Sequence, residues 1–416
     1  MRNTFLTTCV ATALLSLLMA NSVFGQTKPF QDGRFVGRIA YSADGNHNDP
    51  DDWAASPVAL AIFAESGVKD RLVHFDYNCI LPLTDPEYER KHAESVLGAA
   101  ERYGFNRSRF FDCRKNLDQA IASLTAAINE SSATNPLYFV IAGPMEVPAR
   151  GLEKSDPAKR RFVYCLSHSR WNDGFASGYK FTFTKRTVIE QDVHWVQIRD
   201  QNPLLSLSPY KRPARPEEFA AFFWMRDSCD PKVRFLWERT LVSTRPDPSD
   251  AGMAYFLVTG DEDCDPAKLR RLIEDHRPAS PVVARSQIRL EAENFRHLEG
   301  FALEDRKDKT ASHQLNVQRR GGTGGRIRTT FDEPFARAVG RCDVVIRHRD
   351  DEGSRGRYAL FVNGAARGAA WESAGNARGW TSQVLRDVEI RLGDEIRVDA
   401  ESATARLDYV QLNFAD

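Results

Sequence analysis

The sequence predicts an α/β domain built on a parallel sheet, followed by a C-terminal β-sandwich. The chain has 416 residues, more than a single hydrophobic core usually organises. Up to about residue 276, strand-like apolar runs alternate with helix-like runs, as in a parallel sheet with helices on both faces. After a proline-marked boundary at residues 278–281, short alternating runs separated by glycine-rich turns are typical of a sandwich.

The N-terminus has the features of a secretory signal peptide. Arg2 supplies a positive charge, residues 5–19 are mostly apolar or small, and Val23 and Gly25 occupy the −3 and −1 positions of a cleavage site. We therefore expect residues 1–25 to be removed and the mature chain, starting at Gln26, to be secreted or periplasmic. The alternative is a membrane anchor, but the apolar run is short for the ~20 residues of a membrane span, and no later segment is apolar enough to insert.

The first domain, residues 26–283, is expected to alternate strands and helices. The predicted strands cover residues 37–41, 71–75, 109–112, 137–142 and 161–166. The predicted helices cover residues 51–66, 88–103 and 117–128. Because such sheets bind ligands at the carboxyl ends of their strands, near a switch in strand order, the segments that follow strands are the candidate site.

The second domain, residues 284–416, carries shorter and more charged runs. Its predicted strands cover residues 288–293, 325–330, 342–348, 358–362, 388–392, 395–398 and 407–412. This many short strands in ~130 residues indicates a β-sandwich of the galactose-binding or jelly-roll kind.

Charge and cysteine content narrow the classes of partner and cofactor. Lys plus Arg (57) equals Asp plus Glu (57), so there is no basic field to attract nucleic acid. The mature chain keeps six of the seven cysteines, without a CxxC pair, so a zinc ribbon is not indicated. An exported protein can oxidise its thiols. A Cys229–Cys264 disulfide is one interpretation, and buried free thiols are the other.

The most informative stretch, residues 42–53, follows the first strand and opens the first helix. Four carboxylates and two amides fall close together here: Asp44, Asn46, Asn48, Asp49, Asp51 and Asp52. Clustered carboxylates repel one another, and a hard cation that prefers oxygen ligands, such as Ca²⁺, would neutralise them. The alternative is that Asp49 or Asp51 merely caps the helix, a role that needs only one acidic residue.

This stretch resembles the DxDPGxDD motif at the end of the first strand of nucleoside hydrolases, and residues 48–52 are similar to the N-E-P-D-D variant of related exported bacterial families. Residues 142–145 are similar to the family's G-P-L-T turn, and residues 249–254 to its late His-Asp-Pro element. The resemblance implies a calcium site, a base that is Asp44 or Asp49, and sugar hydroxyl groups bound by Asn46 and Asn48. The implied metal ligands are Asp44, Asp49, Asp51, Asp52 and Asp250.

The chain departs from the family's pattern at three places. The spacing from Asp44 to Asp51 is one residue longer, and no His precedes Asp250. The middle aspartate of the motif, which in the family binds calcium and serves as the base, is not matched cleanly; Asn48 and Asp49 lie nearest to it. These departures count against a nucleoside substrate more than against the metal.

Polar residues also follow two later strand-like runs. They are His168, Trp171, Asn172 and Asp173 in the first segment, and Gln197, Asp200 and Asn202 in the second. An indole can stack on a sugar face while amides and carboxylates bind hydroxyl groups, so we predict that these residues bind substrate. The alternative for the first segment is a loop with an Asx turn.

The ends of the second domain, residues 288–295 and 407–412, resemble the first and last strands of family 6 or 35 carbohydrate-binding modules. The resemblance implies a structural calcium shared by Glu291, Glu293 and Asp408. The candidate sugar-binding residues are Tyr358, Trp371, Trp380 and Asn413. The alternative is that Tyr358 and Trp380 belong to the core and that Glu291 and Asp408 are merely exposed.

Together these features predict a secreted, calcium-dependent glycoside hydrolase that cleaves an N- or O-glycosidic bond of a polysaccharide or oligosaccharide and is directed to it by its module. The density of polar residues at strand ends favours this reading. The altered Asp spacing favours a non-catalytic carbohydrate-binding protein that keeps the metal. A true nucleoside hydrolase is a third possibility, although it would not need the module.

Overall fold

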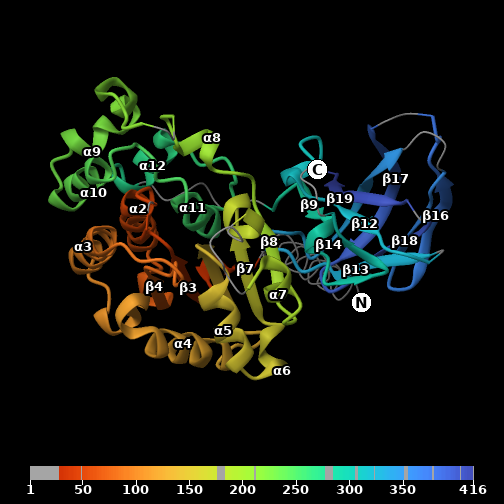
Figure 1. The fold of residues 1–416 in the computed structure, drawn as a ribbon, viewed down its shortest axis with the longest axis horizontal. Coiled ribbons are helices and arrows are strands. Elements are labelled where there is room, and N and C mark those ends of the chain that lie inside the picture. The colour runs from red at the N-terminus through yellow and green to blue at the C-terminus, as the bar shows by residue number, and fades with distance from the viewer. Residues whose placement is uncertain are drawn as a thin grey trace, which may run out of the picture.

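In the computed structural model the chain forms two domains, a helix-rich one and an all-β one (Figure 1). The structure describes residues 28–47, 49–175, 183–209, 212–276, 284–304, 308–322, 324–350, 355–376, 379–402 and 404–415. The predicted signal peptide, Asn48 and residues 278–281 lie outside the described residues. None of the described helices combines the length and the apolar character that a bilayer crossing requires.

A six-stranded parallel sheet forms the centre of the first domain. Its strands, in spatial order, are β5 (Phe110–Asp112), β4 (Leu72–Tyr77), β3 (Arg38–Ala43), β6 (Leu137–Ala142), β7 (Val163–Ser167) and β8 (His194–Gln197). All neighbouring strands pair in parallel. The chain winds from β3 toward β5 and then returns to β6, so the switch in strand order lies between β3 and β6. Ligands of open α/β sheets bind outside this point.

Helices cover both faces of the sheet (Figure 1). Side chains of β3 alternate between two hydrophobic clusters, Tyr41 in one and Ala40 in the other, as successive residues of a strand must. The Tyr41 cluster includes α2 (Asp52–Glu65), α3 (Pro86–Arg102), α10 (Pro231–Val242), α11 (Ala251–Thr259) and α12 (Pro266–Ile273). The Ala40 cluster includes α4 (Cys113–Asn129), α5 (Glu146–Lys154) and α7 (Lys185–Ile189). Shorter helices are α6 (Pro157–Arg160), α8 (Asn202–Leu205) and α9 (Phe223–Asp227).

The predicted strands and helices of this domain are confirmed, with differences at their ends. The strand predicted at 137–142 matches β6, and the helix predicted at 51–66 is α2. Helix α4 begins at Cys113, earlier than predicted, because the Asp112 side chain caps it by accepting a hydrogen bond from Arg114 N. Asn116 interrupts the helix with φ −134° and ψ 40°, so only the part that follows shows regular helical periodicity.

The second domain is the predicted β-sandwich. One antiparallel sheet has the order β10-β13-β18-β15-β16, and the other has β11-β12-β19-β14-β17 with β9 beside β19. The strands are β9 (Gln287–Glu291), β10 (His297–Glu299), β11 (Phe301–Leu303), β12 (Val317–Arg319), β13 (Gly325–Thr330), β14 (Val339–Asp350), β15 (Arg357–Val362), β16 (Ala365–Glu372), β17 (Gly379–Arg391), β18 (Glu395–Glu401) and β19 (Arg406–Phe414). Strands β10, β11 and β12 were not predicted, because three residues are too few to show a pattern, and β16 was not predicted, because it is largely exposed and has no apolar alternation.

Polar and aromatic contacts join the two domains. Phe335 of the sandwich packs edge-on against Phe256 of α11, with ring centroids 5.3 Å apart, and belongs to the core of the first domain. The polar contacts are Lys28 Nζ to Asp332 Oδ1 (2.7 Å), Arg186 Nη1 to Phe295 O (2.7 Å) and Arg296 Nη1 to Asp192 Oδ1 (2.7 Å).

The predicted Cys229–Cys264 disulfide is wrong. Both thiols are free, because Cys264 is buried in the core of the first domain whereas Cys229 is exposed. The alternative of buried free thiols is confirmed for Cys79, Cys113, Cys165, Cys264 and Cys342.

Candidate active site

The loop between β3 and α2 carries the predicted aspartates to the switch point of the sheet. Asp44 directly follows β3, and its backbone N–H donates to Ala142 O at the end of β6 (3.3 Å). Gly45 has a φ of +51°, and a Cβ there would lie 2.0 Å from His92 Nδ1, so this packing requires glycine. Trp53 Nε1 donates to Gly45 O (2.7 Å) and fastens the loop to the first turn of α2.

A second acidic segment reaches the same place from the turn before α11. Asp247 accepts a hydrogen bond from Ser206 Oγ (2.5 Å), and Asp250 Oδ1 lies 2.6 Å from His168 Nε2. With Asp44, Asp49 and Asp51, these two aspartates line a cavity of about 360 Å³, which we call the aspartate cavity. The fold thus joins two acidic segments that are far apart in the chain.

Both acidic segments end at a helix N-terminus. Asp51 and Asp250 occupy the N-cap positions of α2 and α11, but neither side chain accepts a capping hydrogen bond. The interpretation of Asp51 as a simple cap is therefore wrong. The positive ends of both helix dipoles instead lie beside the carboxylates and favour their charge.

Several carboxylate oxygens of this cluster are buried without a hydrogen-bond partner. They are both oxygens of Asp52, Oδ2 of Asp44 and Oδ1 of Asp51. Burial, together with the neighbouring aspartates, raises the pKa of Asp44 to about 6 and that of Asp49 to about 8, and it holds the pKa values of Asp51 and Asp52 well above their ordinary range. Buried carboxylates without partners are unfavourable, so the cluster needs either protons or a cation.

The atoms that the cluster could offer to a metal are all carboxylate oxygens, and calcium prefers oxygen ligands. Among the side chains of the described residues, no three His, Cys, Asp or Glu groups already converge as metal ligands. Asn48, predicted to belong to this site, lies outside the described residues. The unpartnered oxygens of Asp44, Asp51 and Asp52 fit a hard cation, and holding one requires the carboxylates to close around it.

His168 lies between Asp250 and Asp200. Its Nδ1 is 3.6 Å from Asp200 Oδ1 and 3.3 Å from the N–H of Gln201. Burial opposes a charge on the ring, but the two carboxylates raise the pKa of His168 to about 9, whereas the contact with Gln201 N suits a neutral Nδ1. In either state Nε2 carries a proton and donates to Asp250. The side chain is 1% exposed and also lines the aspartate cavity. His168 therefore positions Asp250, and its predicted contact with substrate stays a prediction.

Other predicted substrate residues fall into three groups. Trp171, Asn172 and Asn202 line the aspartate cavity. Asn46 and Asp173 do not: Asn46 is fully buried and exchanges hydrogen bonds with the backbone of Ile80 (3.0 and 3.2 Å), and Asp173 accepts from Ser167 Oγ (2.7 Å). The predictions that these two side chains bind substrate are therefore wrong. Gln197 and Asp200 line a different cavity, between the domains.

Asp247 was missed from the sequence, as were Ser206 and Ser249, which line the same cavity. A signal was present, since residues 247–250 read Asp-Pro-Ser-Asp before an apolar helix, much as residues 49–51 read Asp-Pro-Asp before α2.

In the module, Glu291, Glu293 and Asp408 are 2%, 1% and 0% exposed, so the reading of Glu291 and Asp408 as exposed is wrong. Arg347 pairs with Asp408 (2.5 Å), and Lys185 of the first domain lies 3.7 Å from Glu293 Oε1. Protein cations thus already balance part of the charge, and the structural calcium implied by the resemblance stays a prediction.

The aromatic candidates of the module differ in exposure. Tyr358 is 1% exposed and stacks on Trp371, with centroids 5.7 Å apart, so its prediction as a sugar-binding residue is wrong and the core reading holds. Trp371 and Trp380 are half-buried, and Trp380 Nε1 donates to Asp308 Oδ2 (3.1 Å). Asn413 Oδ1 accepts hydrogen bonds from two glutamine side chains.

Among solved structures, the chain is similar to a GH26-CBM35 β-(1,4)-mannanase of Podospora anserina, with a TM-score of 0.27 and 16% identity over 32% of this chain and 28% of that one. It is also similar to a family 35 carbohydrate-binding module of Clostridium thermocellum, with a TM-score of 0.27 and 18% identity over 32% of this chain and 100% of the module. The fold described above rests on the strand pairing of this chain itself.

No family model matches the chain. A protein of Formosa agariphila, "Uncharacterized protein P22", is 31% identical over 243 residues, which cover 54% of this chain and 84% of that protein. With this identity over most of the relative's length, the chain belongs to the same protein family as protein P22 of Formosa agariphila.

Proposed function

We propose that this protein is a secreted, calcium-dependent hydrolase that cleaves a glycosidic bond of a polysaccharide or oligosaccharide and binds that glycan through its C-terminal module. One observation carries the proposal: aspartates from two distant segments meet in one cavity at the switch point of the sheet, with buried oxygens that lack partners. Open parallel sheets bind their ligands at this switch in strand order, outside the carboxyl ends of the strands.

The side chains around the aspartate cavity suit hydrolysis. Calcium, when bound, would orient a water molecule and lower its pKa. Asp44 or Asp49, which both line the cavity, would take the proton of the attacking water. Asp250 is held by His168, so it keeps its orientation while the other carboxylates adjust. Trp171, Asn172 and Asn202 offer a stacking face and amide groups to a sugar ring.

With no enzyme nucleophile, water attacks the anomeric carbon directly through an oxocarbenium-like transition state and inverts that centre. The glycosidic bond breaks at the same time, and the leaving group takes a proton from a protonated carboxylate of the cluster or from solvent. A carboxylate that binds calcium is a poor nucleophile, which supports direct attack by water over a covalent intermediate.

A non-catalytic carbohydrate-binding protein is the second candidate, favoured by the longer spacing between Asp44 and Asp51. In that case the aspartate cavity holds a cation or protons but activates no water. A nucleoside hydrolase is the third, supported by the motif at residues 48–52 and by the weaker similarities at residues 142–145 and 249–254.

The test is to incubate the mature protein with a panel of glycans and nucleosides, in CaCl₂ and in EDTA, and to measure reducing ends and free bases. New reducing ends in calcium, absent in EDTA and in Asp44→Asn/Asp49→Asn, support the proposal. Free base and ribose from the nucleosides, with no new reducing ends from the glycans, favour the nucleoside hydrolase. Glycan retention in affinity gels without any product favours the binding protein.

A further inference from the structure

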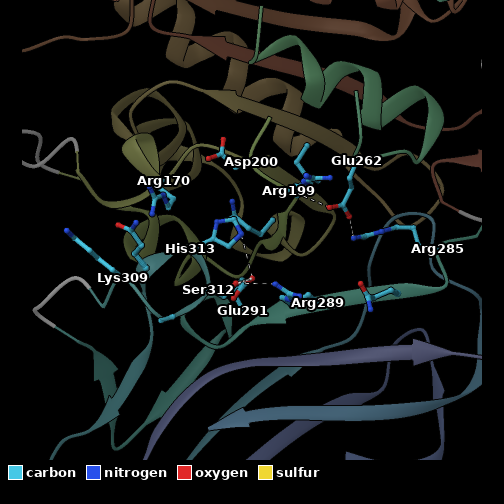
Figure 2. Close-up of a pocket in the computed structure, with 15 residues that line it drawn as sticks. Arg170, Arg199, Asp200, Glu262, Arg285, Arg289, Glu291, Lys309, Ser312 and His313 are labelled. Carbon is cyan, nitrogen blue, oxygen red and sulfur yellow. Dashed lines mark hydrogen bonds and ion pairs between the residues drawn. The ribbon is translucent and has the colours of Figure 1, made fainter. Parts of the chain in front are cut away.

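A second and larger cavity, of about 650 Å³, lies between the two domains and is called here the interdomain cavity (Figure 2). The first domain contributes Arg170, Asp200 and Glu262, and the module contributes Arg289 and Lys309. Figure 2 shows Arg170 and Lys309 at one end of the cavity and Arg285 with Glu262 at the other.

The positive charge of this cavity is only partly neutralised. Arg285 pairs with Glu262, and Arg199 pairs with Asp263 outside the cavity. Asp200 is already engaged, because it accepts hydrogen bonds from the backbone and side chain of Asn202 (3.0 and 2.8 Å) and faces His168.

Two cations of the lining, Arg170 and Lys309, have no ion pair to any described residue. Arg289 interacts electrostatically with the buried carboxylates of Glu291, which also lines the cavity, and Asp408. The guanidinium of Arg289 is held in place, since it donates to Gln411 Oε1 (2.9 and 3.1 Å) and lies over the Tyr409 ring, 4.4 Å from its centroid. The loop that follows Lys309 is strained, because His313 and Gln314, two consecutive non-glycine residues of the lining, have φ values of +48° and +57°. Such backbone persists where the surroundings hold it, and it concentrates at ligand sites.

We propose that the interdomain cavity binds an acidic sugar unit, one that carries a carboxylate or a sulfate ester, of the glycan on which the neighbouring aspartate cavity acts. Guanidinium groups bind such planar or tetrahedral anions through paired hydrogen bonds. Gln287 and Gln314 also line the cavity, and their side-chain amides suit hydroxyl groups, whereas both polar atoms of Gln197 are already hydrogen-bonded to Trp195 and Ser167. The volume lies within the roughly 300–1,000 Å³ of small-molecule sites.

The two cavities are adjacent through one wall. Arg170 lines the interdomain cavity, and the next residue, Trp171, lines the aspartate cavity. In the same wall, Asp200 faces His168, which in turn holds Asp250. One glycan chain can therefore place an acidic unit against Arg170 while a neighbouring unit lies among the aspartates. This inference rests on the proposed function for the identity of the ligand as a glycan.

The test is calorimetric titration of the mature, full-length protein at low ionic strength. The probes are trigalacturonate, a sulfated carrageenan tetrasaccharide, neutral mannotetraose and sodium sulfate. Arg170→Gln/Lys309→Gln should weaken binding of the acidic oligosaccharide about tenfold or more, which corresponds to about 1.4 kcal/mol. The matched control is Arg107→Gln/Lys154→Gln, since both side chains are exposed and lie outside the cavity. It should bind like the wild type, and added NaCl should weaken binding in both.

Tight binding of either acidic oligosaccharide, with this loss in the cavity variant, supports the proposal, and the preferred probe identifies the anionic group. Equal binding of mannotetraose, or equal affinities in the cavity variant and the control, overturns it. If sulfate ion binds as tightly as the acidic oligosaccharide, the cavity is a simple anion site and the proposal of a sugar site is wrong. Binding does not depend on turnover, so acidic-sugar binding without any hydrolysis would reject the proposed function and leave this site standing.

Discussion

His168 Nε2 lies 2.6 Å from Asp250 Oδ1, although 82 positions separate the two residues in the chain. His168 follows β7, and Asp250 begins α11, so the contact joins the carboxyl end of the sheet to a helix N-terminus. On its other side His168 faces Asp200, which lines the interdomain cavity. The buried imidazole of His168 thus lies between the two cavities, and its hydrogen bond fixes the carboxylate of Asp250.

The first prediction concerns this positioning role. His168→Leu removes the donor to Asp250 and should lower calcium affinity and kcat by roughly 10–100-fold, the usual effect of losing an orienting partner of a ligand. His168→Gln keeps a donor near the position of Nε2 and should recover part of both. Calorimetric calcium titration and steady-state kinetics measure the effect. Equal behaviour of the two variants would contradict a role through the hydrogen bond.

The second prediction concerns Asp52, which is fully buried with two unpartnered oxygens. If calcium binds here, Asp52→Asn should lower its affinity at least tenfold, about 1.4 kcal/mol, because a charged ligand is lost, and activity should be lost with it. In chelator the same variant should unfold at a higher temperature than the wild type, because a source of repulsion is removed. Unfolding scans in CaCl₂ and in EDTA measure both effects. A variant that is more stable in both conditions, with no calcium binding by the wild type, would rule out the metal.

The third prediction separates the two candidate bases. Asp49→Asn and Asp44→Asn each keep the shape of the side chain and one oxygen ligand but remove a proton acceptor. The variant that lacks the base should lose roughly 10²–10⁴-fold in kcat with calcium binding largely retained. Parallel losses of calcium affinity and kcat in both variants would show that both aspartates act only as ligands.

The fourth prediction concerns the junction of the domains. Lys185 is buried, and its Nζ lies 3.7 Å from both Asp173 Oδ2 and Glu293 Oε1. Lys185→Met leaves these carboxylates without their cation and should cost about 3–5 kcal/mol in free energy of unfolding. Lys185→Met/Glu293→Gln should recover much of that loss in urea unfolding. If the double variant is as unstable as the sum of the single variants, the two residues are not coupled.

The fifth prediction concerns pH. Burial lowers the pKa of His194 to about 4, and Nε2 donates to Arg161 O (2.9 Å). As the pH falls, His194 of the unfolded chain binds a proton near pH 6.5, whereas His194 of the folded chain binds one only near pH 4. The contribution of His194 to the unfolding free energy is therefore complete above pH 6.5 and is lost between pH 6.5 and about 4. The loss amounts to about 3 kcal/mol.

His194→Gln keeps a donor but does not titrate, so its unfolding free energy should fall less steeply than that of the wild type over this range. Denaturant unfolding at several pH values measures the difference. Parallel pH profiles would show that His194 is not the responsible group.

Local patterns by themselves determined much of this protein. The alternation of apolar runs predicted the strands of the parallel sheet, because burial on both faces leaves continuous apolar segments such as residues 137–142. The acidic run at residues 44–52 was recognisable because its charge density exceeds what helix capping needs. The alternating runs after residue 284 predicted most strands of the sandwich, but not the three-residue strands β10, β11 and β12 or the exposed β16.

Only the tertiary structure decided which of the polar residues meet. Asn46 and Asp49 lie in the same acidic run, yet Asn46 turns inward to the backbone of Ile80, a contact set by the packing of the loop after β4. Asp247 and Asp250 join the cluster through the position of α11, and Arg170 and Lys309 line one cavity through the docking of two domains. Such contacts depend on the register and packing of segments far apart in the chain, and the periodicity of any single segment carries no record of them.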